Sequence, residues 1–226
     1  MPNANSGENY ELTAPAIMLF PNLLVAKKVK KNGREVGDAK FSLNLGIAAD
    51  HPDFLPMRKL VAKLAMEKFP GRNLKLQPPN PDALMFPFTD GTILADKAKA
   101  KVNAGTQGAR PSEFTRGLFI IPCRSKFQPA MACFINGQPT DLNSDELKKL
   151  HADKFFMGAE CLVTINFLAY DRADDTGRDG VTARLNAVAV TGKGTRIGGT
   201  QRSAAGMLGG AQGHSTMEDP TDGDPL

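Results

Sequence analysis

The chain has 226 residues, a hydrophobic fraction of 41% and a formal net charge of +4. This length and composition suit one folded domain with elaborations and exclude a wholly disordered chain. No run approaches the ~20 apolar residues that a membrane helix needs, and the polar first nine residues do not resemble a signal peptide. We therefore expect a cytoplasmic protein with no membrane partner.

The net charge conceals an asymmetry between the body of the chain and its end. The segment from His214 to Leu226 contains no Lys or Arg, and its carboxylates are those of Glu218, Asp219, Asp222 and Asp224. Without these four negative charges the net charge rises from +4 to +8. A basic body with an acidic end is typical of a protein that binds a polyanion and carries a separate interaction tail. An acidic tail that only aids solubility is the alternative.

Strand patterns begin after residues 1–16, which we expect to form a flexible N-terminus. An apolar run from Ile17 indicates an extended segment that Pro21 interrupts. Asn32-Gly33 is then a hairpin signal. Residues 39–47 alternate between polar and apolar, and this period of two predicts a strand whose buried face carries Phe41, Leu43, Leu45 and Ile47.

Residues 52–69 have the apolar spacing of a helix instead, and Pro70-Gly71 ends the pattern, so we predict an amphipathic helix there. Residues 70–115 contain several prolines and glycines and show no long regular pattern. We interpret this stretch as a long basic loop, inserted into the domain and flexible. Its cations are Lys97, Lys99, Lys101 and Arg110.

Strand patterns return at residues 117–123, 129–135, 159–170 and 180–190, with a short helix capped by Ser144 before the last two. Strands and helices do not alternate along the chain, so a doubly wound sheet is not expected. The sequence predicts a mainly β fold with minor α content, in which residues 17–190 form an OB-fold-like antiparallel β-barrel of about six strands with one main helix and long loops. Residues 191–226 are rich in Gly and Ser, and we expect them to be a disordered acidic tail.

Signatures of catalysis and of bound cofactors are scarce. The three histidines are widely separated, and no HExxH motif is present. The three cysteines lie in apolar stretches without a CxxC pair, which indicates buried thiols rather than disulfides or a metal site. The segment Asp171–Asp179 contains four carboxylates, but their spacing does not match an EF-hand and two arginines partly neutralise them. We therefore expect no cofactor, no metal and no enzymatic activity.

What remains is a set of cations beside aromatic rings. A protein that binds single-stranded nucleic acid needs cations along the phosphates and flat rings that stack on the bases. Strand aromatics also serve in cores, and for Phe41 the core is the favoured alternative, whereas Phe127 lies in a polar turn and is the best candidate for an exposed ring. The predicted DNA contacts are Lys40, Phe41, Arg58, Lys99, Lys101, Arg110, Arg116, Arg124, Lys126, Phe127, Tyr170, Arg172 and Arg184.

Short motifs follow one another along the chain in a recognisable order. They are Phe20-Pro21-Asn22-Leu23 and Gly37 to Ser42, then Pro87 to Gly91 and Leu118 to Pro129, and finally Phe156 to Asp171 and Gly180 to Val188. Together they resemble a family of phage single-stranded DNA-binding proteins that was long catalogued as a domain of unknown function and has an OB-fold core.

The resemblance implies a protein that coats single-stranded DNA in replication or recombination, without catalysis and without sequence preference. In a phage it would act in the cytoplasm of the bacterial host. The resemblance also implies a role for the acidic end, which would recruit replication or recombination proteins or compete with DNA for the basic groove. The residues of this partner-binding tail are Glu218, Asp219, Asp222, Asp224 and Leu226.

Two other functions and the oligomeric state stay open at this point. The main alternative is a phage structural or assembly protein with no nucleic-acid role, and the weakest is a nuclease that uses the carboxylates of residues 171–179. We expect a homo-oligomer, with a dimer as one form, but the sequence does not determine the number of copies.

Overall fold

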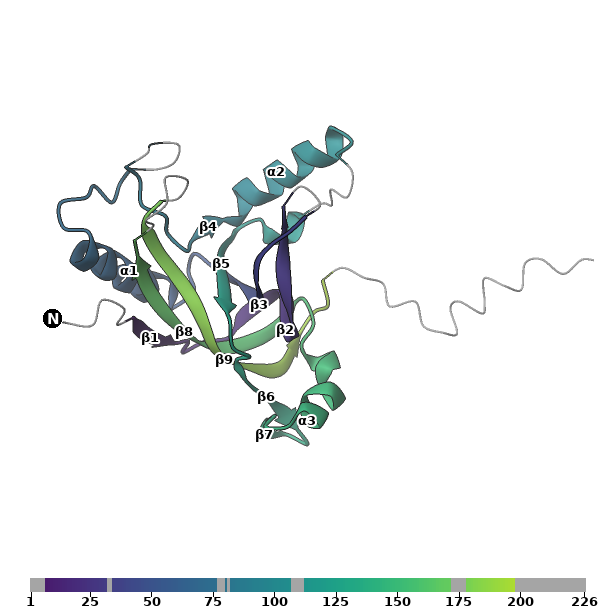
Figure 1. Ribbon diagram of the computed structural model, residues 1–226. Helices are drawn as coiled ribbons and strands as arrows, with labels where there is room; N and C mark the ends of the chain where they lie inside the picture. Colours follow the sequence, from purple (N-terminus) through teal and green to yellow (C-terminus); the bar gives the residue numbers. More distant parts are fainter. Residues whose placement is uncertain are drawn as a thin grey trace, which may run out of the picture.

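Five long strands of the chain pair in a closed circuit. The computed structural model describes residues 7–31, 34–76, 80, 82–106, 112–171 and 178–197. The strands are β2 Ala16–Lys31, β3 Arg34–Ala48, β5 Leu118–Ser125, β8 Ala159–Tyr170 and β9 Gly180–Gly194. The circuit runs β2–β3–β5–β9–β8 and returns to β2, and all neighbours are antiparallel except β5 and β9, which are parallel. This closed five-stranded barrel in a mainly β chain confirms the predicted OB-like fold class (Figure 1).

Four short strands extend the sheet to nine strands, where the sequence predicted about six. They are β1 Glu8–Glu11 beside β8, β4 Thr89–Asp90 beside β5, and the hairpin of β6 Ala130–Ile135 and β7 Gln138–Asp141, which joins the sheet through β9. The turn of this hairpin is Asn136-Gly137, and both residues have positive φ. Such a pair suits the tight turns that connect antiparallel strands.

The interior of the barrel follows the predicted alternation. On β3, Leu43, Leu45 and Ile47 are at most 1% exposed, and they face inward with the residues that pair with them on β5. The predicted buried thiols are also confirmed, since the chain has free, buried cysteines at Cys123, Cys133 and Cys161.

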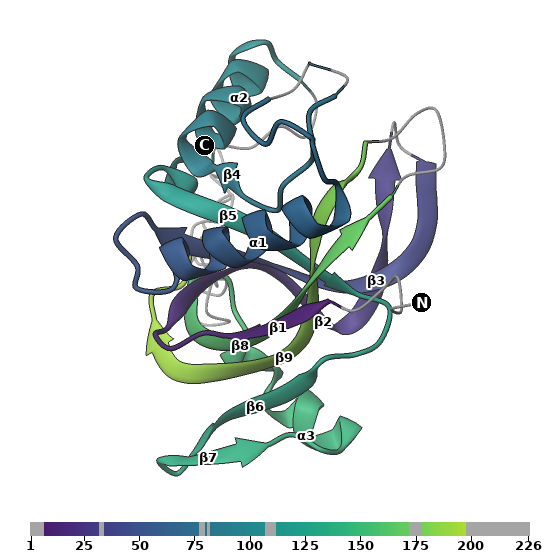
Figure 2. The same cartoon turned by 90° about the vertical axis from the view of Figure 1, so that its left-hand side faces the viewer.

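Helix α1 (Phe54–Lys68) lies across the barrel (Figure 2) and confirms the helix predicted at residues 52–69. Its buried side chains recur at helical spacing and are those of Phe54, Met57, Val61, Leu64 and Ala65. The ring of Phe54 stacks on Phe119 of β5, with 4.2 Å between the ring centroids.

The second predicted helix is also confirmed as α3 (Asp145–Leu150), whose cap Ser144 accepts a hydrogen bond from the N–H of Leu147 at 3.2 Å. A short 3₁₀ turn, η2, follows at Ala152–Lys154.

The carboxylate of Asp53, just before α1, ties the N-terminal segment to the barrel. Asp53 is 1% exposed and accepts hydrogen bonds from the hydroxyls of Tyr10 and Thr13, both at 2.9 Å. It also accepts from the backbone N–H groups of Thr13 and Ala14, at 2.9 and 3.1 Å. These contacts, with the pairing of β1 to β8, show that the predicted flexible N-terminus is wrong for residues 7–16. Residues 1–6 lie outside the described residues.

The stretch 70–115 is also not one flexible loop, because Gly91–Asn103 form helix α2 and Glu113–Thr115 form the 3₁₀ turn η1. Asp90 caps α2 by accepting a hydrogen bond from the N–H of Thr92 at 2.7 Å. Gly91 lies so close to the carbonyl of Thr115 that a Cβ has no room there. The alternating Ala and Lys residues of α2 are good helix formers. The sequence-based prediction missed this cap and this close packing.

The C-terminal boundary also differs from the prediction. β9 continues past residue 190 to Gly194, and the N–H of Ile197 donates to the carbonyl of Met157 at 2.8 Å. The predicted tail at 191–226 is therefore wrong for residues 191–197. Residues 198–226, which include the candidate tail residues, lie outside the described residues.

Replacing Asp53 with Ala should lower the free energy of unfolding by roughly 3 kcal/mol, because two hydroxyls and two N–H groups lose their acceptor. Burial alone would raise the pKa of Asp53, but the hydrogen bonds from Tyr10, Thr13 and Ala14 together lower it below its ordinary value. Burial and the contact with Asp53 raise the pKa of Tyr10 to about 12. Ionised Asp53 therefore stabilises the fold above its unfolded pKa of about 3.9, and this contribution is lost as the pH falls below about 4.

Urea denaturation of wild type and Asp53→Ala at about pH 7 and about pH 3 measures the loss of stability and its dependence on pH. The difference in the free energy of unfolding between the two proteins should be smaller at the lower pH, because protonation of Asp53 removes its contribution in wild type. Tyr10→Phe removes one donor only and should show a smaller loss. A difference between wild type and Asp53→Ala that is the same at both pH values would contradict this account.

Candidate nucleic-acid interface

The strands β3 and β5 turn every second side chain to the outside of the barrel. In their antiparallel register Ser42 pairs with Arg124 and Asn44 with Pro122, next to interior pairs such as Leu43 with Cys123. Arg124 is exposed and the other three outward residues are partly exposed. Together with Lys40 of β3 and the cations beside them on β2 and β9 they form a surface that we call the strand face. It consists of Lys27, Lys40, Ser42, Asn44, Pro122, Arg124 and Arg184.

Cations lie directly opposite each other on the strand face. Lys27 of β2 is the partner of Lys40 on β3, and Arg124 of β5 is the partner of Arg184 on β9. Within the described part of the chain, none of these four forms a salt bridge with a carboxylate. Like charges directly opposite one another destabilise a sheet. The two pairs therefore create a positive patch, without salt bridges of its own, of the kind that attracts phosphate.

The ring of Phe127 lies at the edge of this patch. It is 70% exposed, and the guanidinium of Arg184 is 5.8 Å from the ring centroid. The N–H of Phe127 donates to the hydroxyl of Ser125 at 3.2 Å, which holds the turn after β5. The prediction that this ring is exposed is confirmed. An exposed ring beside a cation is suited to stack on a base while the cation binds a phosphate.

Lys126 follows Arg124 along the chain but is partly neutralised. Its ammonium is 2.7 Å from the carboxylate of Asp38. This hydrogen bond, with the charge of Lys126, lowers the pKa of Asp38 below its ordinary value. Both side chains are largely exposed, so the pair is open to competition from a phosphate.

Three other predicted contacts lie apart from the patch. Arg116 is held by Asp96 at 2.9 Å and by Glu113 at 3.0 Å, so it links α2 to η1. These hydrogen bonds to Glu113 and Asp96 raise the pKa of Arg116 above its ordinary value, so the guanidinium stays charged. Arg58 lies on α1, 5.5 Å from the centroid of its neighbour Phe54. Tyr170 ends β8 and is partly buried.

The remaining predicted contacts are divided among the core, α2 and the part of the chain that is not described. Phe41 pairs with the buried Ser125 and has the interior register of Leu43, as the core alternative predicted, although it stays partly exposed. Lys99 and Lys101 are exposed on α2. Arg110 and Arg172 lie outside the described residues. Lys27, in contrast, was not predicted, because its place opposite Lys40 depends on a register that contains β-bulges.

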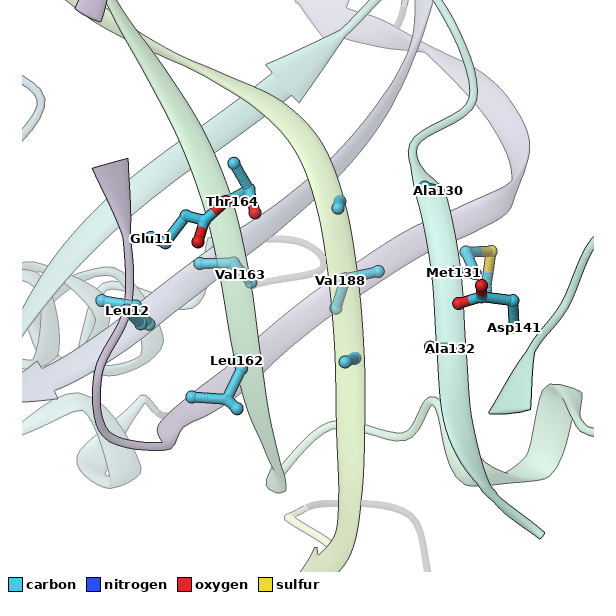
Figure 3. A pocket seen from close by; sticks show the side chains of 12 residues that line it. Glu11, Leu12, Ala130, Met131, Ala132, Asp141, Leu162, Val163, Thr164 and Val188 are labelled. Atoms are coloured by element: carbon cyan, nitrogen blue, oxygen red, sulfur yellow. The ribbon is translucent and has the colours of Figure 1, made fainter. Parts of the chain in front are cut away.

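A hollow of about 320 Å³ on another part of the surface is chemically different. It lies over β8, β9 and β6, and small or apolar side chains make up most of its lining (Figure 3). Its ionisable lining residues are Glu11 and Asp141. Carboxylates repel phosphates, so this hollow does not extend the positive patch.

No group of three His, Cys, Asp or Glu residues that could hold a metal ion occurs in the described ranges. Among the helices with described coordinates, none is long and apolar enough to cross a membrane.

Comparisons with known proteins bear on the fold. No family model and no curated protein matches the sequence. Among solved structures, the chain is similar to the single-stranded DNA-binding protein from bacteriophage Enc34, with a TM-score of 0.55 and 14% identity over 86% of this chain and 87% of that one. A C-terminal truncation of the phage protein gives a TM-score of 0.54 and 15% identity over 81% and 86% of the two chains. The same protein in complex with ssDNA gives a TM-score of 0.53 and 17% identity over 82% of this chain and 87% of that one.

Identities this low show a shared fold rather than a shared function. The arrangement of the strands is nevertheless similar to that of a phage single-stranded DNA-binding protein, whose fold the motifs of the sequence also implied. The fold that the resemblance implied is thereby confirmed.

Replacing Arg124 with Gln should raise the free energy of unfolding by about 0.2–1 kcal/mol, because it removes the repulsion from Arg184 across the strands. Chemical denaturation at low ionic strength measures the change, and added salt should reduce it. A loss of stability greater than about 1 kcal/mol would show that Arg124 has a structural role, contrary to this view of the strand face.

Proposed function

We propose that this protein binds single-stranded DNA without sequence preference and without catalysis. The observation that carries the proposal is the pair of like-charged contacts, Lys27 with Lys40 and Arg124 with Arg184, beside the exposed ring of Phe127. Among the described residues these four cations form no salt bridge, whereas the phosphates of a bound strand would pair with them. The OB-like fold also presents the corresponding strands and the loops around them to oligonucleotides in other proteins.

The combination of cations with an exposed aromatic ring suits single-stranded DNA better than duplex DNA. Cations alone bind the phosphates of either form. A flat exposed ring contributes only where a base is unstacked and free to lie on it, which favours the single strand by ~1–3 kcal/mol for each stacked base. Every base has such a face, so the contact reads no sequence.

The structural neighbour in complex with ssDNA supports the same function, since its fold resembles this one over most of both chains. We extend the proposal to a role in coating DNA during replication or recombination, in the cytoplasm of a bacterial host if the protein is phage-encoded. A homo-oligomer, such as a dimer, belongs to the same proposal.

Titration of labelled oligo-dT and of its duplex at two salt concentrations, followed by fluorescence anisotropy, tests this function. We expect tight binding to the single strand that weakens steeply with salt. The slope of the logarithm of the binding constant against the logarithm of the salt concentration should fall in magnitude by about 0.7 when Arg124→Gln removes one phosphate contact. Phe127→Ala should weaken binding about 10-fold or more.

Lys59→Gln is a matched control for the charge change, because Lys59 is exposed on α1, away from the strand face. It should leave the affinity and the salt slope unchanged. No binding to the single strand at low salt would reject the proposal and favour the alternative of a phage structural or assembly protein.

The acidic end has a place in this proposal as a competitor of DNA or as a binding site for partner proteins. Its carboxylates, from Glu218 to Asp224, have the charge that the strand face attracts. Deleting residues 214–226 should therefore tighten binding of oligo-dT at low salt, and the gain should disappear at high salt because screening removes the competition. An unchanged affinity at low salt would exclude competition and leave only the partner-binding role.

A further inference from the structure

Phe20 has an unusual backbone and an unusual environment for a phenylalanine. Its φ is +48°, and among the described residues the only other non-glycine residue with positive φ is Asn136, which lies in a tight turn. Left-handed backbone is unfavourable for a bulky side chain, and an observed outlier of this kind is a reason to look for function. The ring of Phe20 is also 48% exposed.

A second ring, that of Phe114, lies beside Phe20. The two ring centroids are 5.7 Å apart and the planes are inclined by 55°. Phe114 belongs to η1, at the end of the stretch that contains α2, whereas Phe20 belongs to β2. Two segments far apart in the chain therefore combine to form a small aromatic surface, which we call the Phe20–Phe114 pair.

The register of the strands places this pair at one end of the strand face. Leu19 pairs with Asn44 and Asn22 pairs with Ser42, so Phe20 lies beside the outward residues Asn44 and Ser42 of β3. Phe127, in contrast, follows Ser125, which pairs with Phe41 further toward the start of β3. Along β3 these pairing positions are one to three residues apart, and across the sheet the two sites are separated by β3, since Phe20 belongs to β2 and Phe127 follows β5. Two interstrand spacings of 4.7–4.9 Å put the sites at least roughly 10 Å apart.

The cations and amides of the strand face lie between these two sites. Arg124 and Ser42 form one cross-strand pair in this interval, and Asn44 lies on the side of Phe20. Neighbouring bases in a stacked strand are about 3.4 Å apart. A separation of at least roughly 10 Å therefore requires a strand of about three or more nucleotides to reach from one ring to the other.

A purely structural role for Phe20 would be to cover Leu19, which is fully buried although it pairs with an outward residue. That role accounts poorly for the exposure and the backbone of Phe20. A covering side chain would be buried, and a chain that only needed the left-handed turn would tolerate Gly or Asn with less strain.

We propose that the Phe20–Phe114 pair is a second stacking site for an unpaired nucleobase, at the opposite end of the strand face from Phe127. The inference rests on the proposed function, because it assigns a further contact to the same bound strand. A strand long enough to reach both sites is held by rings at its two ends and by cations between them. A shorter strand occupies one site only.

The experiment compares Phe20→Leu with wild type on oligo-dT that ranges from about 2 to about 16 nucleotides, which begins below the ~4–16 nucleotides of known sites on single OB folds. Leucine keeps an apolar side chain at position 20 but offers no flat ring. We expect the variant to bind the longer strands about 10-fold more weakly, whereas binding of the shortest strands, for which Phe127 is enough, changes less than about two-fold. Phe20→Tyr retains a ring and should bind like wild type at every length.

Phe134→Leu is the matched control, since Phe134 is 41% exposed on β6 and belongs to neither aromatic site. It should bind like wild type at every length, and thermal denaturation should show that all variants are folded. Equal affinity of Phe20→Leu and wild type for the longer strands would overturn the inference while leaving the proposed function intact. A loss that is the same at every length would overturn it too, because it would indicate a structural role. Failure of wild type to bind any length would reject the proposed function itself.

Discussion

The pairing of β8 with both β2 and β9 closes the barrel, and the rest of the structure depends on this closure. β8 meets β2 at Ala16 and Ile17 only, whereas it pairs with β9 along nearly its whole length. In a closed barrel each strand has one set of side chains inside and the other outside. The interior takes large apolar side chains such as Met18 and Phe167, both fully buried. The exterior of β3 and β5 is then free to carry polar and charged groups.

The additions to the barrel leave this exterior open. α1 is held by its apolar side and by the buried carboxylate of Asp53, and α2 begins where Gly91 packs on Thr115 and then projects from the barrel (Figure 1). The β6–β7 hairpin extends from β9 in another direction (Figure 2). None of these elements buries Arg124 or Arg184, which both remain exposed. A strand of nucleic acid would thus meet a surface that the fold itself does not use for packing.

Several features of this surface are unfavourable for the folded protein on its own. Like charges lie opposite each other, a phenylalanine ring is 70% exposed at position 127, and Phe20 has left-handed backbone. Folded proteins are only marginally stable, so features that each reduce stability are expected to concentrate where a protein binds or reacts. Their concentration on and beside one face of the barrel distinguishes it from the hollow over β8 and β6, where the lining is mainly apolar or acidic.

The sequence by itself determined those elements whose signals come from residues near each other in the chain. The period of two at residues 39–47 predicted the inner face of β3, and the helical period at 52–69 predicted α1, because burial on one side leaves a periodic pattern. Ser144 predicted α3 for a similarly local reason. Helix α2 was missed, since its packing depends on a glycine that contacts a residue beyond the next loop. The OB-fold core was implied by a family resemblance rather than by periodicity, and the order of the strands in the sheet was not predicted.

Only the tertiary structure decided which side chains meet on the strand face. Lys27 lies opposite Lys40 between two register shifts of the β2–β3 pairing, Arg124 lies opposite Arg184, and Phe20 lies beside Phe114. In each case the partners come from different elements. Register between strands is set by the turns, the bulges and the packing of the whole barrel, and a shift of one residue would turn every side chain to the other face. Local periodicity shows that a strand has an outer face, but the cross-strand partners on that face are fixed by hydrogen bonds between distant parts of the chain.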